Sequence, residues 1–285
     1  MQSMTNGYEQ KDTILHVENL SITYGDQVII RDISFEEKNT IRPGMSQGQV
    51  IAFVGRSGRG KSTLFRALTG LETPSTGRVL IPDYSKPVAE GKQPAKIVRE
   101  GDVGFVNQKY TLFRHKTVSQ TLHFALRAAN LSKEEREKKI VPYLQEWGLE
   151  KCRHQYPNQL SGGQRQRTAI LEQLLSSGYY IVLDEPFSGL DVGNIMSVRK
   201  SFQLINSSNE LNTIIFSTHD IELAVELADS LYVLGYDRTS DGSVSSSGTL
   251  LKHFDLKQMG LAWHNGLTAG HLDLVKEIKE VMLRS

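Results

Sequence analysis

Short runs of apolar and β-branched residues alternate with stretches of helical periodicity along most of this chain. Six of these runs predict strands, at positions 14–24, 28–35, 50–54, 103–106, 179–183 and 213–217. The turn signal Gly25-Asp26 separates the first two, which therefore predict an N-terminal antiparallel β-subdomain. Because the later strand signals alternate with helical ones, the pattern predicts an α/β fold whose sheet is largely parallel.

A block of helical periodicity interrupts the strand signals between residues 109 and 158. Two helices are expected there, at 117–130 and 132–147. Ser132 and Glu135 have the spacing of a capping box at the start of the second helix. Pro142 is expected to kink or divide that helix, because it lacks an N–H donor and crowds the preceding turn.

These signals divide the chain into three parts. Residues 1–108 and 159–236 are expected to form the α/β core with its β-subdomain, and residues 109–158 an inserted α-helical subdomain. The tail 237–285 is expected to end in an amphipathic helix, 269–283, with an apolar face made of Leu274, Val275, Ile278, Val281 and Met282. Stretches with turn-forming or irregular composition predict loops at 36–48, 82–101 and 239–248.

Charge and cysteine content narrow the possible functions. The 285 residues include 33 Lys and Arg against 32 Asp and Glu, so no bulk field attracts the chain to nucleic acid or anionic lipid. Cys152 is the single cysteine, which excludes an intramolecular disulfide and a multi-cysteine zinc site and suits a reducing cytoplasm. The polar N-terminus does not resemble a secretory signal, and no segment approaches the ~20 apolar residues that span a bilayer. Work at a membrane would therefore require other subunits.

A glycine-rich segment follows the strand signal at 50–54 and precedes a helical pattern. Its sequence matches G-x-x-x-x-G-K-[ST], a motif whose backbone N–H groups surround a polyphosphate at a helix N-terminus. In this motif Lys61 reaches the outer phosphates and the Ser62 hydroxyl binds magnesium. A chance match is expected in roughly one chain of this length in a hundred. The candidate phosphate-binding residues are Gly55, Arg56, Ser57, Gly58, Arg59, Gly60, Lys61, Ser62 and Thr63. Alone, the motif is equally compatible with kinases, GTPases and motor ATPases.

Two carboxylates, Asp184 and Glu185, end the apolar run at 179–183. A run without polar residues is typical of a central parallel strand, and ligands bind where such strands end. Asp184 is expected to hold magnesium through a water, and Glu185 to orient or deprotonate an attacking water. The alternative is a pair of solvated turn carboxylates before Pro186.

The segment Leu160-Ser161-Gly162-Gly163-Gln164, followed by Arg165-Gln166-Arg167, resembles the LSGGQ signature of the ABC (ATP-binding cassette) ATPases. Physically it is a helix start, with Ser161 and Gln164 spaced as a capping box. A helix cap alone does not explain the paired glycines, because glycine is unfavourable in a helix. The resemblance implies a P-loop NTPase core of the RecA-like type with ATP and Mg²⁺ as ligands.

Four further positions match the family in order and spacing. The resemblance implies that Tyr24 stacks on adenine, that Gln108 is the Q-loop ligand of the metal, that Asp191 lies in the D-loop and that His219 senses the γ-phosphate. Each match is weak evidence alone, because other roles are open. Tyr24 could be a packed strand residue, Gln108 could form hydrogen bonds within a loop, and His219 could be a cap near the next helix. The match covers roughly residues 14–236.

The resemblance also implies partners. Two cassettes of this family pair head to tail, so that Ser161, Gly162, Gly163 and Gln164 of one act in trans on ATP held by the other. We therefore expect a homodimer or a pair with a close paralogue, joined to separate transmembrane permease subunits on the cytoplasmic face of the membrane. A substrate-binding protein is a further partner compatible with this assignment, and no nucleic acid is expected.

The expected function is an ATPase that powers solute transport, with import favoured because Asp-Glu-Pro-Phe at 184–187 resembles bacterial importers. The alternatives are an exporter ATPase or a soluble ABC ATPase associated with ribosomes, DNA or iron–sulfur assembly. The tail is too short for the β-rich regulatory domain of many sugar importers, which disfavours a regulated importer of the sugar type. Two departures stand out: Arg56 and Arg59 add charge to the phosphate loop, and residues 170–174 replace a common Ala-Arg-Ala run.

Overall fold

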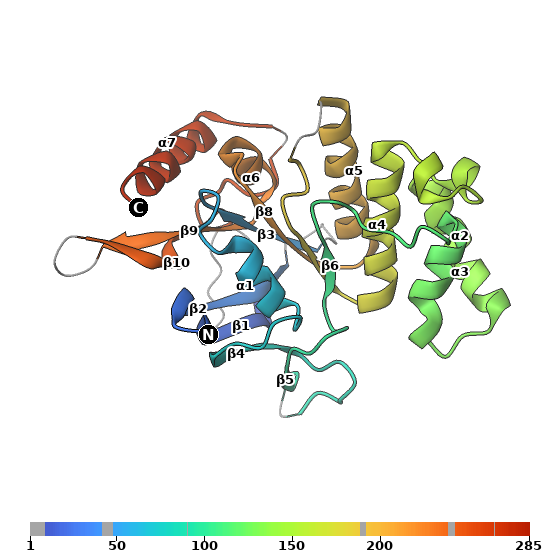
Figure 1. The fold of residues 1–285 in the computed structure, drawn as a ribbon, viewed down its shortest axis with the longest axis horizontal. Helices are drawn as coiled ribbons and strands as arrows, with labels where there is room; N and C mark the ends of the chain where they lie inside the picture. The colour runs from blue at the N-terminus through green and yellow to red at the C-terminus, as the bar shows by residue number, and fades with distance from the viewer. Residues whose placement is uncertain (1–8, 42–47, 90, 189–191, 239–242, 265) are drawn as a thin grey trace.

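The computed structural model describes residues 9–41, 48–89, 91–188, 192–238, 243–264 and 266–285 (Figure 1). The strands in these ranges are β1 (Glu9–Tyr24), β2 (Gln27–Ile41), β3 (Gln49–Val54), β4 (Thr76–Pro82), β5 (Ala95–Ile97), β6 (Gly104–Val106), β7 (Tyr180–Leu183), β8 (Thr213–Thr218), β9 (Ser230–Arg238) and β10 (Val244–Asp255). The α-helices are α1 (Lys61–Leu68), α2 (Val118–Ala125), α3 (Lys133–Glu146), α4 (Gly162–Ser177), α5 (Val192–Ser208), α6 (Ile221–Leu227) and α7 (Ala269–Leu283). Short 3₁₀ turns are η1 (Leu126–Ala128), η2 (Glu150–Cys152) and η3 (Pro157–Gln159).

Within the described ranges, the strands form one sheet in the order β5-β4-β1-β2-β10-β9-β3-β8-β7-β6. From β9 to β6 the neighbouring strands are parallel, whereas β1 pairs antiparallel with β2 and β4, and β4 pairs antiparallel with β5. Every residue of β3, β7 and β8 is buried, because these strands lie inside the sheet with both faces covered. The expected α/β fold with antiparallel N-terminal strands is confirmed.

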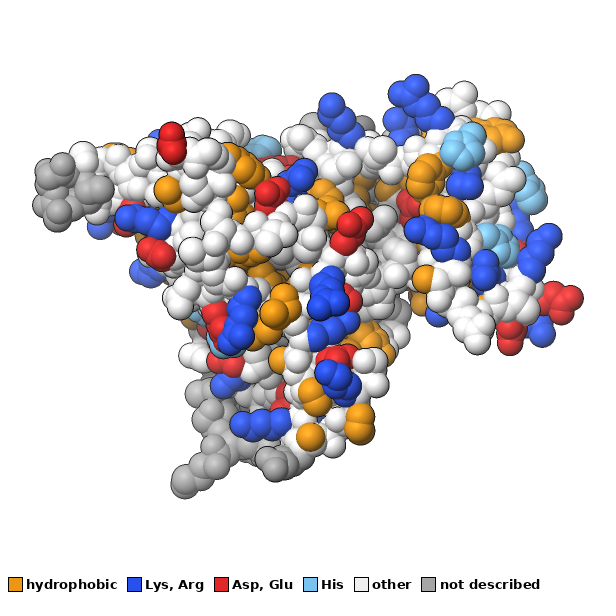
Figure 2. All heavy atoms as spheres, turned by 60° about the horizontal axis from the view of Figure 1, so that its bottom comes forward, with side chains coloured by type: hydrophobic (Ala, Val, Ile, Leu, Met, Phe, Trp, Pro, Cys, Tyr) orange, Lys and Arg blue, Asp and Glu red, His pale blue; other side chains and the backbone are white. Residues whose placement is uncertain are grey.

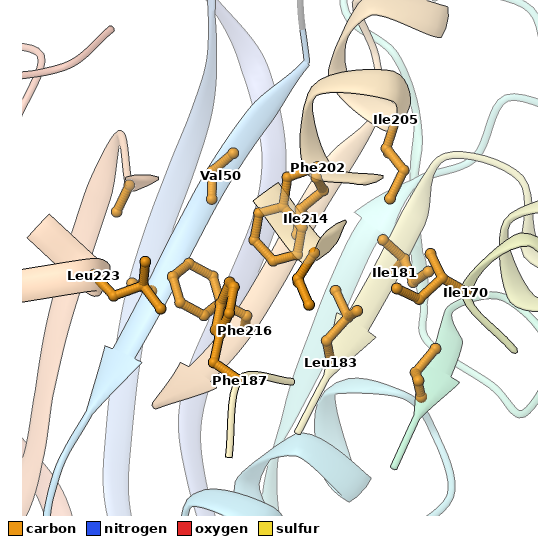
Figure 3. Packing of buried hydrophobic residues seen from close by; sticks show 14 of the residues in the cluster. Val50, Ile170, Ile181, Leu183, Phe187, Phe202, Ile205, Ile214, Phe216 and Leu223 are labelled. Atoms are coloured by element: carbon orange, nitrogen blue, oxygen red, sulfur yellow. The ribbon is translucent and has the colours of Figure 1, made fainter. Parts of the chain in front are cut away.

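Two hydrophobic clusters cover the faces of the parallel strands. Along β3, Val50, Ala52 and Val54 belong to one cluster, and Ile51 and Phe53 belong to the other. This alternation follows from the pleat of a strand, in which successive side chains point to opposite faces. Figure 3 shows part of the first cluster, where aromatic rings from three segments pack together, those of Phe187, Phe202 and Phe216.

The helical segment and the terminal helix follow the sequence pattern closely. The capping box of α3 forms as expected, since Ser132 Oγ accepts from the N–H of Glu135 and the Glu135 carboxylate accepts from the N–H of Ser132. Helix α7 has the predicted bounds, and its buried face contains Leu274, Val275 and Ile278. Pro142 was expected to kink or divide this helix; division is wrong, because α3 runs from Lys133 to Glu146 through this residue. Pro142 is exposed, so solvent can hydrate the carbonyl that it leaves unpaired.

All three predicted loops contain strand residues, since the stretch 82–101 begins with the last residue of β4 and includes β5. β2 continues to Ile41, and Glu37 on it is buried, where Tyr232 Oη donates to its carboxylate at 2.7 Å and Lys257 Nζ lies 3.8 Å away. The burial of this charged residue depends on partners that are distant in the chain, so local sequence does not indicate it. Residues 244–248 are likewise not a loop but the start of β10, which lies between β9 and β2.

Charge is unevenly distributed over the surface. Residues 109–158 contain 10 Lys and Arg against 5 Asp and Glu, although the whole chain is nearly neutral. Figure 2 shows Lys, Arg and His side chains gathered on the lobe at the right, which corresponds to the helical segment in Figure 1. This lobe would therefore attract an acidic partner. None of the described helices is both long and apolar enough to cross a membrane.

Candidate functional site

The glycine-rich loop lies between β3 and α1, and its glycines are required by the geometry. A Cβ on Gly55 would lie 2.4 Å from the carbonyl oxygen of Leu234, and one on Gly60 would lie 2.5 Å from Ile30 Cδ1. Gly60 is also the N-cap of α1, with φ of 90°, and Gly58 has φ of 78°. Side chains at these positions would be strained or would displace the sheet, so the loop keeps its backbone accessible.

Lys61 begins α1 and directs its ammonium group back across the loop. Its side chain is only 7% exposed, and Nζ donates to the Gly55 carbonyl at 2.7 Å and to the Arg56 carbonyl at 3.4 Å. The Glu185 carboxylate lies 3.4 Å from the same nitrogen. A buried cation with these neighbours is positioned to meet an anion that enters the loop.

The two acidic residues follow β7, and a serine of the neighbouring strand β8 hydrogen-bonds to both of them. Ser217 Oγ donates to Asp184 Oδ1 at 2.7 Å and accepts from the N–H of Glu185 at 2.9 Å. Glu185 has φ of 49°, a left-handed conformation that is costly for a residue with a side chain. This backbone turns the Glu185 carboxylate toward Lys61 on one side and His219 on the other, whose Nδ1 lies 3.0 Å away.

The structure therefore brings together the three residues expected to be catalytic. Lys61, Glu185 and His219 come from the starts or ends of three different elements, yet one carboxylate contacts both other side chains. His219 is 64% exposed, so this group opens to solvent on the histidine side. Ser62, which is expected to bind magnesium, is exposed at the first turn of α1.

Two other predicted positions lie at or just after the ends of strands. Tyr24 is at the end of β1 and is 47% exposed, and Gln108 is exposed just after β6, the strand next to β7. Among the residues that the structure describes, neither hydrogen-bonds to Lys61, Glu185 or His219. Partial desolvation and then the nearby Glu72 carboxylate raise the pKa of the Tyr24 hydroxyl. Asp191 lies outside the described residues.

The signature segment forms a separate, well-capped helix start. Ser161 Oγ accepts from the N–H of Gln164 at 3.2 Å, and the Gln164 side chain accepts from the N–H of Ser161 at 2.9 Å. Gly162 is exposed, and a Cβ there would meet nothing within 4 Å. Helix α4 packs against α2, α5, β6 and β7, whereas α1 lies across the sheet nearer β9 and β10 in Figure 1. The signature glycines and the phosphate loop of one chain thus belong to different parts of the molecule.

Comparison with known proteins agrees with this geometry. Residues 39–188 match the family model described as ABC transporter. The chain belongs to the ABC transporter family. It is 34% identical over 234 residues to the sulfate/thiosulfate import ATP-binding protein CysA of Synechocystis, which covers 82% of this chain and 60% of that protein. It is 35% identical to the probable CysA of Chlorella vulgaris, over 76% of this chain and 86% of that protein.

Solved structures show the same fold. CbiO1 from Clostridium perfringens, part of the ABC transporter complex CbiONQ, matches with a TM-score of 0.67 and 27% identity over 88% of this chain and 92% of that one. The P-loop NTPase fold of ABC ATP-binding subunits is therefore confirmed. The chain spans only 60% and 65% of the length of the Synechocystis and Thermosynechococcus CysA proteins that it matches.

Two residues near the ABC motifs were missed in the sequence. Ser217 binds the Asp184 carboxylate and the Glu185 backbone N–H, and the available signal was a polar residue directly after the apolar run 214–216 of β8. Nothing in the sequence indicates a role for Tyr236. In the structure its hydroxyl donates to the Gly58 carbonyl at 3.1 Å, and the Arg59 guanidinium lies 3.9 Å from its ring centre. A Cβ on Gly248 of β10 would lie 2.3 Å from the Arg59 carbonyl oxygen. Strands β9 and β10 therefore support the phosphate loop.

Proposed function

We propose that this chain is the ATP-hydrolysing subunit of an ABC importer, which drives solute uptake through separate membrane-spanning subunits. The observation that carries the proposal is the contact of the Glu185 carboxylate with both Lys61 and His219 beside the glycine-rich loop. A phosphate-binding loop, a candidate base and a candidate γ-phosphate sensor are the parts that ATP hydrolysis requires.

The loop fits a nucleotide triphosphate. A side chain at Gly55 would clash with the β9 backbone and Gly60 has a positive φ, so the loop is held by glycines whose neighbouring backbone N–H groups can face phosphate oxygens at the helix N-terminus. Lys61 then exchanges part of its contact with backbone carbonyls and Glu185 for the outer phosphates. Ser62 and Asp184 would hold Mg²⁺ that arrives with the phosphates, with Gln108 as a further ligand, and the ion would neutralise their charge.

Glu185 is the proposed base. Its carboxylate accepts a proton from the attacking water, or orients that water, while the Ser217 hydroxyl holds its backbone N–H in place. His219, hydrogen-bonded to the same carboxylate and exposed on its other side, is placed to contact the γ-phosphate. Tyr24 contributes the proposed adenine-stacking ring, because it is exposed at the end of β1.

A second cassette completes each site. Ser161 and Gly162 offer an open helix N-terminus, but they lie on α4, away from the loop of the same chain. We assign Ser161, Gly162, Gly163 and Gln164 to ATP held by a partner cassette, identical or closely related. Residues 109–158 form the helical subdomain that moves against the core, made of 1–108 and 159–236, when the pair closes.

The direction of transport and the membrane partners follow from relatives. The CysA proteins are named as import ATP-binding proteins, and CbiO1 is described as part of a transporter complex. By similarity, this chain binds permease subunits at the cytoplasmic face of the membrane. Purification of the chain from gently solubilised membranes should recover multi-span proteins, whereas recovery of ribosomes, DNA or iron–sulfur proteins alone would contradict the transport assignment.

The dimer gives the sharpest test of the site. With ATP, Glu185→Gln should convert monomer into a stable dimer, because the amide keeps the shape of the carboxylate but cannot accept a proton. Adding Ser161→Arg should reverse this by filling the phosphate space at the helix start. Light scattering after size exclusion, with and without ATP, measures the result directly.

A matched control separates recognition from lost helix capping. Ser132 caps α3 through the same capping-box hydrogen bonds that Ser161 makes on α4, so Ser132→Arg removes a cap worth ~1 kcal/mol outside the signature. The Ser132→Arg, Glu185→Gln protein should still dimerise. If Glu185→Gln stays monomeric at high ATP, or if both arginine variants dimerise equally, the trans arrangement is wrong.

A further inference from the structure

A buried group of hydrogen bonds joins three segments next to Glu185. Tyr110 Oη donates to the carbonyl oxygen of Pro186 at 2.5 Å. Gln166 Nε2 donates to the same carbonyl at 3.0 Å and also to Tyr110 Oη. The side chain of Gln166 is 1% exposed, and burial raises the pKa of the Tyr110 hydroxyl to about 12, so the hydroxyl keeps its proton at neutral pH.

Each member of this triad comes from a segment that the proposed function uses. Tyr110 follows Gln108 in the turn after β6, Gln166 lies in the second turn of the signature helix α4, and Pro186 directly follows Glu185. Two donors on one carbonyl fix the orientation of that peptide group, because each bond constrains its plane. The triad thus lies between the signature helix and the turn that presents the carboxylate.

The turn needs such support. Glu185 and Tyr110 both have positive φ, 49° and 47°, which costs of order 1–3 kcal/mol for a residue that is not glycine. On the other side of Pro186, Phe187 is buried and packs against Phe202 and Phe216 (Figure 3). The strained backbone at Glu185 is therefore held by Ser217 on one side and by the triad and the Phe187 ring on the other.

We infer that Tyr110 and Gln166 are positioning residues: through the Pro186 carbonyl they set the orientation of the Glu185 carboxylate and tie it to the signature helix. This inference rests on the proposed function. Neither side chain has a described contact with Lys61, Glu185 or His219, so both act through the backbone. Because the signature helix is assigned to the partner's ATP, the triad also connects Glu185 to the occupancy of the second site.

Removal of the triad's hydrogen bonds tests this role. Tyr110→Phe keeps the ring and removes the hydroxyl, and Gln166→Met removes both amide donors at similar volume. Each should lower kcat for ATP hydrolysis about five- to tenfold, the effect of one or two lost hydrogen bonds on a positioned base, with little change in KM. Since both act on one carbonyl, the double variant should lose less than the product of the two single losses.

Tyr143→Phe is the matched control. Tyr143 is a second half-buried tyrosine whose pKa is raised by burial, but its hydroxyl is not part of the triad. This variant should keep the wild-type kcat. Unchanged kcat in both Tyr110→Phe and Gln166→Met would overturn the inference, as would parallel losses of kcat, ATP affinity and melting temperature, which indicate general damage to packing.

Hydrogen exchange gives a reading that does not require activity. The N–H of Ser188 donates to the Glu185 carbonyl at 3.1 Å, so it reports on the order of this turn. Amide exchange in peptides spanning 184–188 should be several-fold faster in Tyr110→Phe than in the wild type, and unaltered in Tyr143→Phe. If the wild type does not hydrolyse ATP, the proposed function is wrong. Unchanged exchange in Tyr110→Phe would refute the positioning role, whether or not the protein hydrolyses ATP.

Discussion

Replacement of the buried Glu172 carboxyl by an amide should stabilise the protein at pH 8 much more than at pH 5. Glu172 lies on α4 among the residues that depart from the common Ala-Arg-Ala run, and it is 7% exposed. Burial raises the pKa of its carboxyl to about 7, an effect that the Arg127 charge only partly offsets. The folded protein therefore resists ionisation of a group that ionises freely when the chain unfolds.

The magnitude follows from linkage between protonation and folding. A pKa raised from 4.5 to about 7 corresponds to about 3 kcal/mol, at about 1.4 kcal/mol for each pKa unit. Below pH 4.5 the carboxyl is protonated in both states and contributes nothing. As pH rises from 4.5 to 7 only the unfolded state releases the proton, so stability falls, and above pH 7 the full penalty remains. Glu172→Gln removes this penalty, about 3 kcal/mol at pH 8 and below about 1 kcal/mol at pH 5.

Urea unfolding at 25 °C measures the difference. The free energy of unfolding of Glu172→Gln and of the wild type is compared at both pH values. The control is Glu210→Gln, at an exposed turn position, whose free energy of unfolding should equal that of the wild type at pH 5 and at pH 8. An equal gain at pH 5 and pH 8 would show that the amide simply packs better. A loss of stability at pH 8 would refute the reasoning, since it would mean that Arg127 stabilises an ionised Glu172.

Two further substitutions test the phosphate loop. Lys61→Ala should weaken ATP binding and abolish turnover while the loop still folds, because it removes the buried cation that faces the outer phosphates; hydrolysis at the wild-type rate would refute the assignment. Gly55→Ala should lower the melting temperature as well as ATP affinity, because its Cβ would lie 2.4 Å from a backbone oxygen of β9; Gly162→Ala, whose Cβ meets nothing within 4 Å, should leave the melting temperature unchanged.

The sequence alone determined the features that depend on neighbouring residues. The bounds of α7, the capping boxes at Ser132 and Ser161 and the loop around Lys61 were predicted correctly as structure, because helical periodicity and cap spacing extend over a few residues. The position of Glu185 at the ligand-binding edge of the sheet was also predicted, since ligands bind where parallel strands end, whereas its contact with Lys61 was not predicted.

Only the tertiary structure decided which distant residues support that site. Glu37 is buried because Tyr232 and Lys257 meet it, and β10 joins the sheet between β9 and β2, far from its neighbours in sequence. Tyr110 and Gln166 are ordinary polar residues until packing brings both to one carbonyl. A buried polar group is stable only with its partners in place, and those partners are fixed by the packing of the whole chain rather than by local preference.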